Sequence, residues 1–394
     1  MKHQERKSLV VGPMIIVCLS LVTLWGCGGG GGGSDGKPCD LCPPPASAQF
    51  VYTANGGSDN VSGFAGDAST GALSLVSGAS FAAGDINENV PGVLTADAAG
   101  KFVFVGNANS KNISVFTINR ATGVLTEVAG SPFASGASAA VRVHPSGKFL
   151  YAANFDQGSI SVFGIDAATG ALSAIAGSPF ALDGLVMSLA LHTSGNFAYA
   201  TFAGSDGLLG IAVFTINAQT GALTRVPHPS LELQAGNLTM DPTGKFLYSA
   251  RNKLFLTFSA GGGSTGIWSL AINSTTGALT AGDAAAAAAD PAEVVIDPSG
   301  KFLYDADEQT GTAGLFTIDR NTGVLSHVSD TATGNQPFSV AVGGAGKFLY
   351  VANAGSNNIS AFTIAGNSGA LTAIPGSPYS TGTTPRAVIA VSPR

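Results

Sequence analysis

Alternation of apolar and polar residues, interrupted by short turn segments, recurs from residue 49 to the C-terminal residues. The clearest copy is the segment 347–364, where two runs of alternating apolar residues flank a turn made of Gly, Asn and Ser. Alternation with a period of two, bounded by such turns, predicts paired antiparallel β-strands. We therefore expect an all-β structure over this part of the chain.

The same pattern occurs seven times. An aromatic residue marks one strand of each copy, at spacings of 46 to 56 residues: Phe50, Phe102, Phe149, Phe197, Phe246, Phe302 and Phe348. A Thr/Ser-Gly-Ala/Val-Leu turn marks each copy a second time, and these turns begin at Thr70, Thr122, Thr169, Thr220, Thr276, Thr322 and Ser368. Self-similarity at such a period is typical of architectures in which every repeat is one small structural unit.

Each copy divides into four short strands. In the third copy we expect strands at 140–144, 149–153, 160–165 and 171–176. The Asp-Pro-Ser-Gly segment at 297–300 suits a type I turn between the first two strands of another copy. Seven units of four antiparallel strands predict a seven-bladed β-propeller rather than a sandwich.

The two ends of the repeat region complement each other. The first copy begins at Gln49 with no first strand before it, and the last copy is followed by a spare strand over 387–391. We expect this strand to complete the first blade, because ring closure removes exposed sheet edges. In every first strand, two alternate positions are apolar and are expected to pack between blades: Leu94 and Ala96, Val141 and Val143, Leu189 and Leu191, Leu238 and Met240, Val294 and Ile296, Val340 and Val342, and Ile389 and Val391.

The first 26 residues follow another pattern. Three positive residues precede an apolar run over 9–25, which is typical of a secretion signal. The run ends in Leu24-Trp25-Gly26-Cys27, which resembles the lipobox of bacterial lipoproteins. This resemblance implies cleavage before Cys27 and a lipid on that residue, with an uncleaved anchor as the alternative. We expect a location in the bacterial cell envelope, on a periplasmic or cell-surface face, with membrane contact through the lipid anchor only.

These patterns divide the chain into three parts: a signal peptide at 1–26, a Gly/Pro-rich tether at 27–48 and a propeller at 49–394. Within the tether, Cys39 and Cys42 form a CxxC pair. Outside the cytosol we expect a local disulfide between them. A redox-active pair and half of a zinc site are the alternatives.

Composition narrows the range of partners. The sequence is 45% hydrophobic and 11% charged, with a net charge of −6, so it has enough apolar residues for a large core. A negative net charge without a basic face argues against binding to nucleic acid, because phosphate binding requires Lys and Arg. No Lys/Arg-rich run occurs in the repeats, so we do not expect binding to an anionic membrane surface. We expect a monomer.

The repeats resemble the propeller lactonase family. Two segments carry the resemblance, Lys-Phe-Leu-Tyr-Val-Ala-Asn with its continuation at 347–364 and His-Pro-Ser-Gly-Lys-Phe-Leu-Tyr at 144–151. The resemblance covers 49–394 and implies the seven-bladed fold. The family includes 6-phosphogluconolactonase and carboxymuconate-lactonising enzymes. It is similar to surface-protein propellers with Tyr-Val-Thr-Asn repeats. Its enzymes usually carry Pro-Arg-His before a first strand and Asn-Glu at the end of a second. Here the candidate segments read Ala-Val-Arg at 140–142, Leu-Val-Met at 185–187 and Ala-Asn-Phe at 153–155, so the resemblance assigns no catalytic residues.

Propeller ligands bind over the central channel, and most first-strand residues nearest to it are small. Larger polar side chains stand out at Arg142, Asn237, Glu293 and Arg386. The two arginines could together hold a carboxylate or phosphate, and Glu293 could act as a general base on a water that attacks a lactone carbonyl. The alternative is that Arg142 and Glu293 only satisfy each other or backbone groups. The expected ligand-binding residues are Asn237, Ser188 and His228.

Other polar residues are expected to be structural. His144 and His192 occupy a turn position where other copies carry Asp, and we expect both to cap turns. Acidic loop residues come singly from different loops, which does not favour a calcium site: Asp85, Glu88, Asp156, Asp183, Asp206, Asp305, Asp307 and Glu308. We therefore expect no metal and no cofactor.

Two functional hypotheses remain. The first is a binding or scaffold propeller that holds a small molecule, a glycan or a protein at the channel face. The second is a lactonase. The expected envelope location and the missing family motifs favour the first, since phosphorylated sugar lactones are cytosolic metabolites. The polarity of the channel discriminates them, because an enzyme should gather charged groups around one point.

Overall fold

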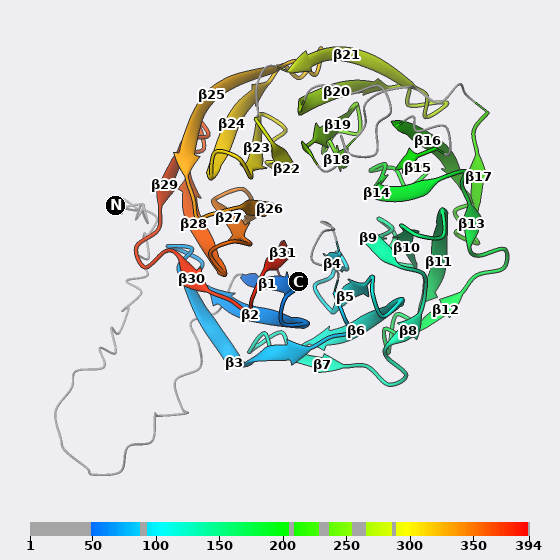
Figure 1. Ribbon diagram of the computed structural model, residues 1–394, viewed down its shortest axis with the longest axis horizontal. Helices are drawn as coiled ribbons and strands as arrows, with labels where there is room; N and C mark the ends of the chain where they lie inside the picture. Colours follow the sequence, from blue (N-terminus) through cyan, green and yellow to red (C-terminus); the bar gives the residue numbers. More distant parts are fainter. Residues whose placement is uncertain are drawn as a thin grey trace, which may run out of the picture. The chain divides into compact units, whose positions relative to one another are not determined.

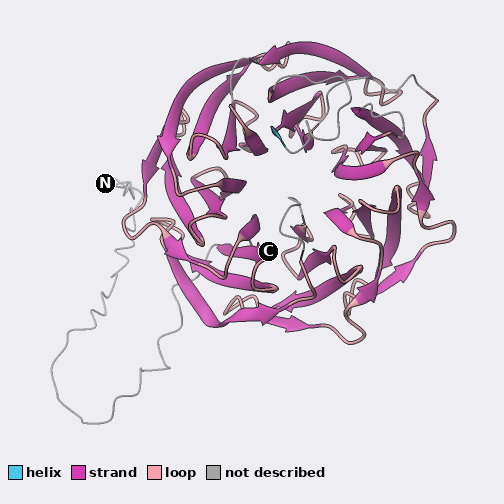
Figure 2. Ribbon diagram, in the orientation of Figure 1, coloured by secondary structure: helices cyan, strands magenta, loops and turns pink. Residues whose placement is uncertain are grey.

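The computed structural model describes residues 49–86, 93–204, 209–227, 236–253, 265–285 and 289–392. In these residues, seven antiparallel sheets surround a central channel (Figures 1 and 2), which confirms the all-β seven-bladed propeller. Each blade has four main strands, which follow sequence order from the channel outward except that the innermost strand of the first blade is the last strand of the chain. Among the described residues, no helix is both long enough and apolar enough to cross a membrane.

The strands of the first four blades have the following bounds, from the channel outward. The first blade contains β31 (Pro385–Val391), β1 (Gln49–Asn55), β2 (Asn60–Gly66) and β3 (Leu73–Ala82). The second contains β4 (Leu94–Ala96), β5 (Phe102–Asn107), β6 (Asn112–Ile118), β7 (Leu125–Glu127) and a short β8 (Phe133–Ala134) that also pairs with β6. The third contains β9 (Ser138–Val143), β10 (Phe149–Asn154), β11 (Ser159–Ile165), β12 (Leu172–Ala174) and β13 (Phe180–Ala181). The fourth contains β14 (Leu185–Leu191), β15 (Phe197–Ala203), β16 (Leu209–Ile216) and β17 (Leu223–Arg225).

The remaining three blades complete the ring. The fifth contains β18 (Asn237–Met240), β19 (Phe246–Arg251), β20 (Gly266–Ile272) and β21 (Leu279–Ala285). The sixth contains β22 (Pro291–Ile296), β23 (Phe302–Asp307), β24 (Thr312–Ile318) and β25 (Leu325–Ala332). The seventh contains β26 (Pro337–Gly343), β27 (Phe348–Asn353), β28 (Asn358–Ile364), β29 (Leu371–Ala373) and β30 (Tyr379–Ser380).

The C-terminal strand closes the ring as predicted. Strand β31 pairs with β1 in an antiparallel ladder that runs from Phe50 opposite Val391 to Asn55 opposite Pro385, with one bulge (Figure 1). The two segments are at least 330 residues apart in sequence, yet they form adjacent strands of one sheet. The sheet edge of β1 is therefore covered by the other end of the chain.

In all seven blades the predicted first-strand residues pack between blades, but in the first blade they pack against the following blade instead of the preceding one. In the third blade, for example, Val143 pairs with Leu150, the residue after the marker Phe149. In the first blade, Val391 instead pairs with the marker Phe50 itself, so the register differs by one residue. Consequently Val388 and Ala390 pack against the seventh blade, whereas Ile389 and Val391 pack against the second, and Ile389 also lines the channel cavity. Ser392-Pro393 resembles the turn of the other blades in sequence, but β31 and β1 are far apart along the chain, so no turn sets their register.

The two sequence markers form the contact between neighbouring blades. The marker Phe50 of the first blade packs on the turn glycine Gly123 of the second, where a Cβ would lie 2.5 Å from the Phe50 Cδ1. That glycine also has a φ of +75°, which favours glycine over any other residue. Tyr52, two residues after the marker, donates its hydroxyl hydrogen to the Gly123 carbonyl at 2.8 Å. The phenylalanine and the glycine recur together because each blade binds the next through them.

The two turn histidines cap their turns as predicted and also bind the following blade. In His144, Nδ1 accepts the backbone N–H of Ser146 at 3.1 Å, and Nε2 lies 2.9 Å from the carbonyl oxygen of Gly195 in the next blade. His192 repeats this arrangement with Ser194 and Gly244. A ring nitrogen that accepts an N–H carries no hydrogen, so Nδ1 is the acceptor and Nε2 the donor in both rings.

Candidate functional site

The channel wall is built from the first strands of the blades, and their register sets side chains at two levels. In each blade a loop joins the second strand to the third, such as residues 56–59 in the first blade. We call the face of the propeller that carries these loops the loop face. The level nearer that face holds polar side chains on four consecutive blades: Ser188, Asn237, Glu293 and Ser339. The next level down holds Thr95, Arg142, Ala190, Thr239, Val295, Ala341 and Ile389. Most of that lower level is apolar, and Arg142 is its one charged member among the described strands.

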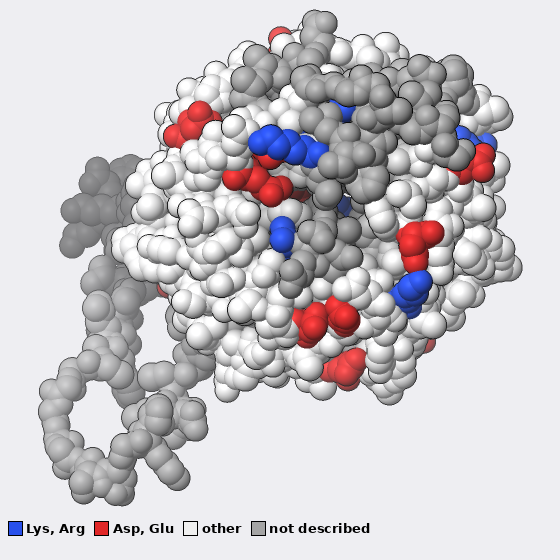
Figure 3. All heavy atoms as spheres, in the orientation of Figure 1, with Lys and Arg blue, Asp and Glu red and all other residues white. Residues whose placement is uncertain are grey.

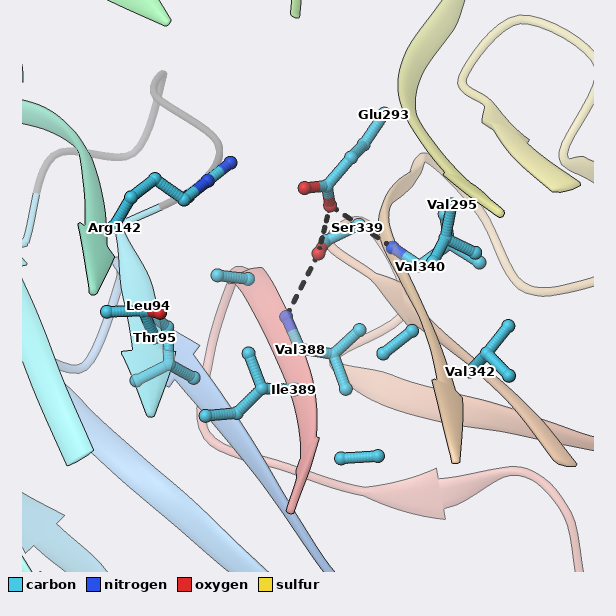
Figure 4. Close-up of a pocket in the computed structure, with 13 residues that line it drawn as sticks. Leu94, Thr95, Arg142, Glu293, Val295, Ser339, Val340, Val342, Val388 and Ile389 are labelled. Atoms are coloured by element: carbon cyan, nitrogen blue, oxygen red, sulfur yellow. Dashed lines mark hydrogen bonds between the residues drawn. The ribbon is translucent and has the colours of Figure 1, made fainter. Parts of the chain in front are cut away.

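A cavity of about 280 Å³ lies within the channel and contains two of the predicted catalytic residues. Arg142 from β9 and Glu293 from β22 line it from different blades, and Ser339 from β26 lies beside Glu293 (Figure 4). The guanidinium of Arg142 and the carboxylate of Glu293 point toward each other across this space (Figure 4). The structure therefore places the guanidinium of Arg142 and the carboxylate of Glu293 on one cavity.

The carboxylate of Glu293 is held by the seventh blade. Its Oε2 accepts the Ser339 hydroxyl hydrogen at 2.5 Å and the Val340 backbone N–H at 3.3 Å. Ser339 Oγ in turn accepts the Val388 backbone N–H at 3.0 Å. The second carboxylate oxygen, Oε1, points toward Arg142 (Figure 4). One oxygen is thus fixed by the scaffold while the other faces the cavity.

The surroundings of Glu293 and Arg142 shift both pKa values. Burial among protein atoms raises the pKa of Glu293, and the Ser339 hydrogen bond, the attraction of Arg142 and the Val340 hydrogen bond oppose that rise in this order. Burial lowers the pKa of Arg142, and attraction to Glu293 opposes this. Both side chains keep part of their surface open to the channel. Arg142 Nη1 also donates to its neighbouring carbonyl, Val141 O, at 2.9 Å.

Arg386 lies apart from this pair. It occupies the bulge between Pro385 and Ala387, does not line the cavity, and places its guanidinium 4.2 Å from the centre of the Phe338 ring. Nearby Glu308 has its pKa raised to about 6, mainly by burial, and Arg386 lowers it. The structure therefore does not join Arg142 and Arg386 into one anion clamp, because the bulge turns Arg386 away from the channel level that alternation predicted.

Two predicted ligand-binding residues bind the neighbouring strand. The Asn237 amide donates to the carbonyl oxygen of Ala292 in the sixth blade. Ser188 Oγ accepts the backbone N–H of Leu238 in the fifth blade at 3.0 Å. Both side chains are almost fully buried and neither lines the cavity. His228, Cys27, Cys39 and Cys42 lie outside the described residues.

The acidic loop residues form no metal centre in the described part of the chain. There, no group of three or more His, Cys, Asp or Glu side chains is placed to hold an ion. Acidic and basic side chains are scattered over the loop face (Figure 3), and one exposed pair joins Lys111 Nζ to Asp156 Oδ2 at 2.6 Å. Glu88 and Asp206 lie outside the described residues.

Sequence reasoning missed Ser339, because it singled out only the larger polar side chains of the first strands. The available signal was positional. Ser339 occupies in the seventh blade the place that Glu293 occupies in the sixth, since they pair with Ala352 and Ala306 at the same point of the second strand. Neighbouring first strands lie side by side, so side chains at equal levels of adjacent blades come within hydrogen-bonding distance.

The fold and the channel site together define a class of protein. The sequence profile of the family described as "Lactonase, 7-bladed beta-propeller" matches residues 45–137, 130–231 and 228–342. The chain therefore belongs to the seven-bladed β-propeller lactonase family. No curated protein matches the chain in sequence.

Several solved structures share this fold. A protein of Bacteroides uniformis, provisionally assigned as a 6-phosphogluconolactonase, superposes with a TM-score of 0.70 at 20% identity, covering 88% of this chain and 100% of that chain. A similarly assigned protein of Bacteroides fragilis gives 0.67 at 22% identity, covering 88% and 98%. The periplasmic gluconolactonase PpgL of Pseudomonas aeruginosa gives 0.69 at 18% identity, covering 88% and 99%. At these identities the likeness shows the fold.

Proposed function

We propose that the protein hydrolyses a lactone in the channel cavity, with Glu293 as general base and Arg142 as the group that polarises the carbonyl. The proposal is carried by one observation: a carboxylate with a raised pKa and a guanidinium face each other across one cavity. This arrangement supports an enzyme over a scaffold, because an enzyme should gather charged groups around one point. Family membership supports the same class of reaction.

The reaction uses groups already placed. A water molecule between Glu293 Oε1 and the substrate loses a proton to Oε1 while its oxygen attacks the lactone carbonyl carbon. Arg142 donates hydrogen bonds to the oxyanion that develops on the carbonyl oxygen. The ring C–O bond then breaks, the Glu293 carboxyl returns its proton to the departing ring oxygen, and a hydroxy acid leaves the site. Ser339 and Val340 hold Oε2, so Oε1 keeps its direction throughout.

The raised pKa of Glu293 suits this role. A carboxylate at its ordinary pKa is a weak base at neutral pH, and proton transfer improves as the pKa of the base approaches the working pH. Burial supplies the rise, while Ser339 and Arg142 keep the carboxylate form available. No cofactor is required for such a reaction, and we propose that the protein acts as a cofactor-free monomer.

The test is lactone hydrolysis by the full-length protein, followed as proton release. Glu293→Gln keeps the shape of the side chain and removes the base, so we expect kcat to fall by about 10²–10⁴-fold. The matched control is Asp183→Asn, the same change at an exposed loop position. Unchanged turnover in Glu293→Gln would refute the assignment of the base, and absence of turnover with every lactone would refute the reaction.

Binding without turnover is the second candidate. It is favoured by the number of polar channel residues that hold the ring together, since Ser188, Asn237 and Ser339 all bind the next strand. A small molecule, glycan or protein would then occupy the channel face unchanged. Calorimetric titration distinguishes the two candidates, because a binder gives a saturable heat with no hydroxy acid formed.

The envelope location is part of the same proposal. We propose a lipid on Cys27 and a position on the periplasmic or cell-surface side of a membrane, supported by the resemblance of residues 24–27 to a lipobox. Labelled fatty acid should be incorporated into the full-length chain and not into Cys27→Ser. Equal labelling of both would contradict the anchor.

A further inference from the structure

The cavity has two chemically different ends. One end carries Arg142, Glu293 and Ser339, and the remaining wall is mostly aliphatic (Figure 4). The aliphatic residues come from four blades and include Leu94, Val295, Val342, Val388 and Ile389. Thr95 is the one further hydroxyl on this wall. A substrate with a polar ring and an apolar substituent would match both ends.

The charges of the wall do not suit a phosphorylated substrate. A phosphate monoester carries about −1.5 to −2 charges at neutral pH and is usually bound by several Arg or Lys side chains. The described wall has one cation, Arg142, and it faces the carboxylate of Glu293. A phosphate beside Arg142 would therefore also lie beside Glu293, and like charges at close range repel. Arg386, the nearest candidate for a second cation, does not line the cavity.

The wall also offers few partners for sugar hydroxyls. Each hydroxyl buried without a hydrogen bond carries a penalty, so a polyhydroxylated ring needs a donor or acceptor at nearly every carbon. The Ser339 hydroxyl already donates to Glu293 and accepts from Val388. Most of the wall beyond that point presents methyl groups, which favour an alkyl substituent.

We propose that the substrate class is an uncharged lactone with a short alkyl substituent, rather than a sugar lactone or its phosphate. This inference rests on the lactonase function proposed above and names its substrate. The ring carbonyl lies between Arg142 and Glu293, and the alkyl group lies against Val295, Val342 and Ile389. A volume of about 280 Å³ is near the lower end of the ~300–1,000 Å³ typical of ligand pockets, so the substituent is short.

A series of δ-lactones tests the proposal on the full-length protein. The series is δ-valerolactone, its 5-methyl, 5-ethyl and 5-propyl derivatives, glucono-δ-lactone and its 6-phosphate, all with one ring size. We expect kcat/KM to rise about fourfold for each added methylene until the cavity is full, the equivalent of ~0.8 kcal/mol per buried CH₂. We expect glucono-δ-lactone to be hydrolysed less efficiently than the 5-propyl compound, and its phosphate least of all.

Each outcome has a distinct meaning. Preference for the alkyl lactones supports both the function and the substrate class. Higher kcat/KM for glucono-δ-lactone or its phosphate overturns the substrate class and leaves the lactonase function standing. No hydrolysis of any member overturns both.

A variant of the wall gives a second measurement. Val295→Thr replaces one methyl by a hydroxyl at a level where other blades carry Thr95 and Thr239, so the first strand tolerates threonine there. We expect the ratio of kcat/KM for 5-propyl to unsubstituted lactone to fall several-fold in this variant. An unchanged ratio would count against contact between the alkyl group and this wall.

Discussion

Ser339 connects the proposed base to the scaffold. Its hydroxyl donates to Glu293 and accepts from the backbone of β31, so one side chain joins three blades. The bond to Glu293 stabilises the carboxylate and lowers its pKa against the effect of burial. Ser339 is therefore a positioning residue, which acts on the reaction through Glu293.

Removing that hydroxyl should change the pH dependence of the proposed reaction. In Ser339→Ala the Glu293 carboxylate loses its strongest stabilising contact, so its pKa rises. The base must be deprotonated, and the acidic limb of kcat/KM should move to higher pH. The measurement is the pH profile of kcat/KM for wild type and variant.

Ser188→Ala is the matched control. Ser188 accepts a backbone N–H from the next blade as Ser339 does, but it does not contact Glu293. We expect both variants to lose about 1–2 kcal/mol of unfolding free energy, because each leaves a buried N–H without its acceptor. Only Ser339→Ala should shift the acidic limb of the pH profile of kcat/KM. Equal shifts in both would mean that Ser339 acts through stability alone.

Asp305 is a buried carboxyl in a position where other blades have small or apolar residues. Its pKa is raised to about 7, first by burial and then by nearby Asp307 and Asp330, against the opposing effect of the Gly314 N–H, which donates at 2.6 Å. The folded-state pKa lies above the unfolded value near 4. The stability associated with this group is therefore fully present below about pH 4 and is lost as the pH rises through about 7.

Asp305→Asn should remove this pH dependence. The amide keeps an oxygen for the Gly314 N–H and cannot ionise. We expect the variant to be more stable than wild type at pH 8, by up to ~4 kcal/mol for a shift of about three pKa units, and the gain to shrink toward pH 5. Urea unfolding at both pH values measures this. A gain of the same size at pH 5 and pH 8 would show that ionisation is not its cause.

At the scale of single elements, the turn before the fourth strand shows how the repeats stay uniform. In six blades its first residue is Asp or Asn, whose side-chain oxygen accepts two backbone N–H groups of the turn: Asp67, Asn119, Asp166, Asn217, Asn273 and Asp319. The seventh blade has Ala365 there and keeps the same backbone bonds, from the Gly369 N–H to Ala365 O and from the Ala365 N–H to Ala370 O. The seventh turn thus has the backbone hydrogen bonds of the other six but lacks the side-chain cap.

Ala365→Asn should stabilise the protein. The new amide oxygen would accept the backbone N–H groups of residues 367 and 368, as its counterparts do, and a gain of about 1 kcal/mol is expected. Thermal or urea unfolding measures it. The reverse change, Asn119→Ala, removes the cap from the second blade and should lose a similar amount. If Ala365→Asn is neutral while Asn119→Ala is destabilising, the seventh turn differs from the others in geometry.

The strands and turns could be predicted because the same residue types recur at the same positions of each repeat. Alternation, the marker Phe and the turn Gly all act within about ten residues or between equivalent places of adjacent blades. Only part of the cavity lining could be predicted from the sequence. Arg142 and Glu293 stood out as charges, but Ser339 became visible only when β22 and β26 were placed side by side. Arg386 and Ile389 were misplaced because a bulge and a missing turn shift the register of β31.

At the scale of the whole molecule, β31 determines whether the ring is closed. It covers the edge of β1, supplies Val388 N–H to Ser339, and contributes Val388 and Ile389 to the cavity wall. Its ladder with β1 covers Phe50 to Asn55. Structure and the proposed activity therefore both depend on a strand that no turn attaches to its partner.

Removal of residues 385–394 should open the ring and expose an unpaired strand edge. We expect the truncated protein to unfold at lower urea concentration and to associate through β1, because open edges pair with other chains.

A synthetic peptide of residues 383–394, added in trans, should restore a monomer and the wild-type unfolding midpoint, since the strand binds through backbone bonds and the side chains of Val388 and Ala390. The same peptide with Val388→Pro lacks the N–H that Ser339 accepts and should fail. Size-exclusion chromatography with urea unfolding makes the comparison, and a truncated protein that stays monomeric with an unchanged midpoint would show that closure by β31 is dispensable.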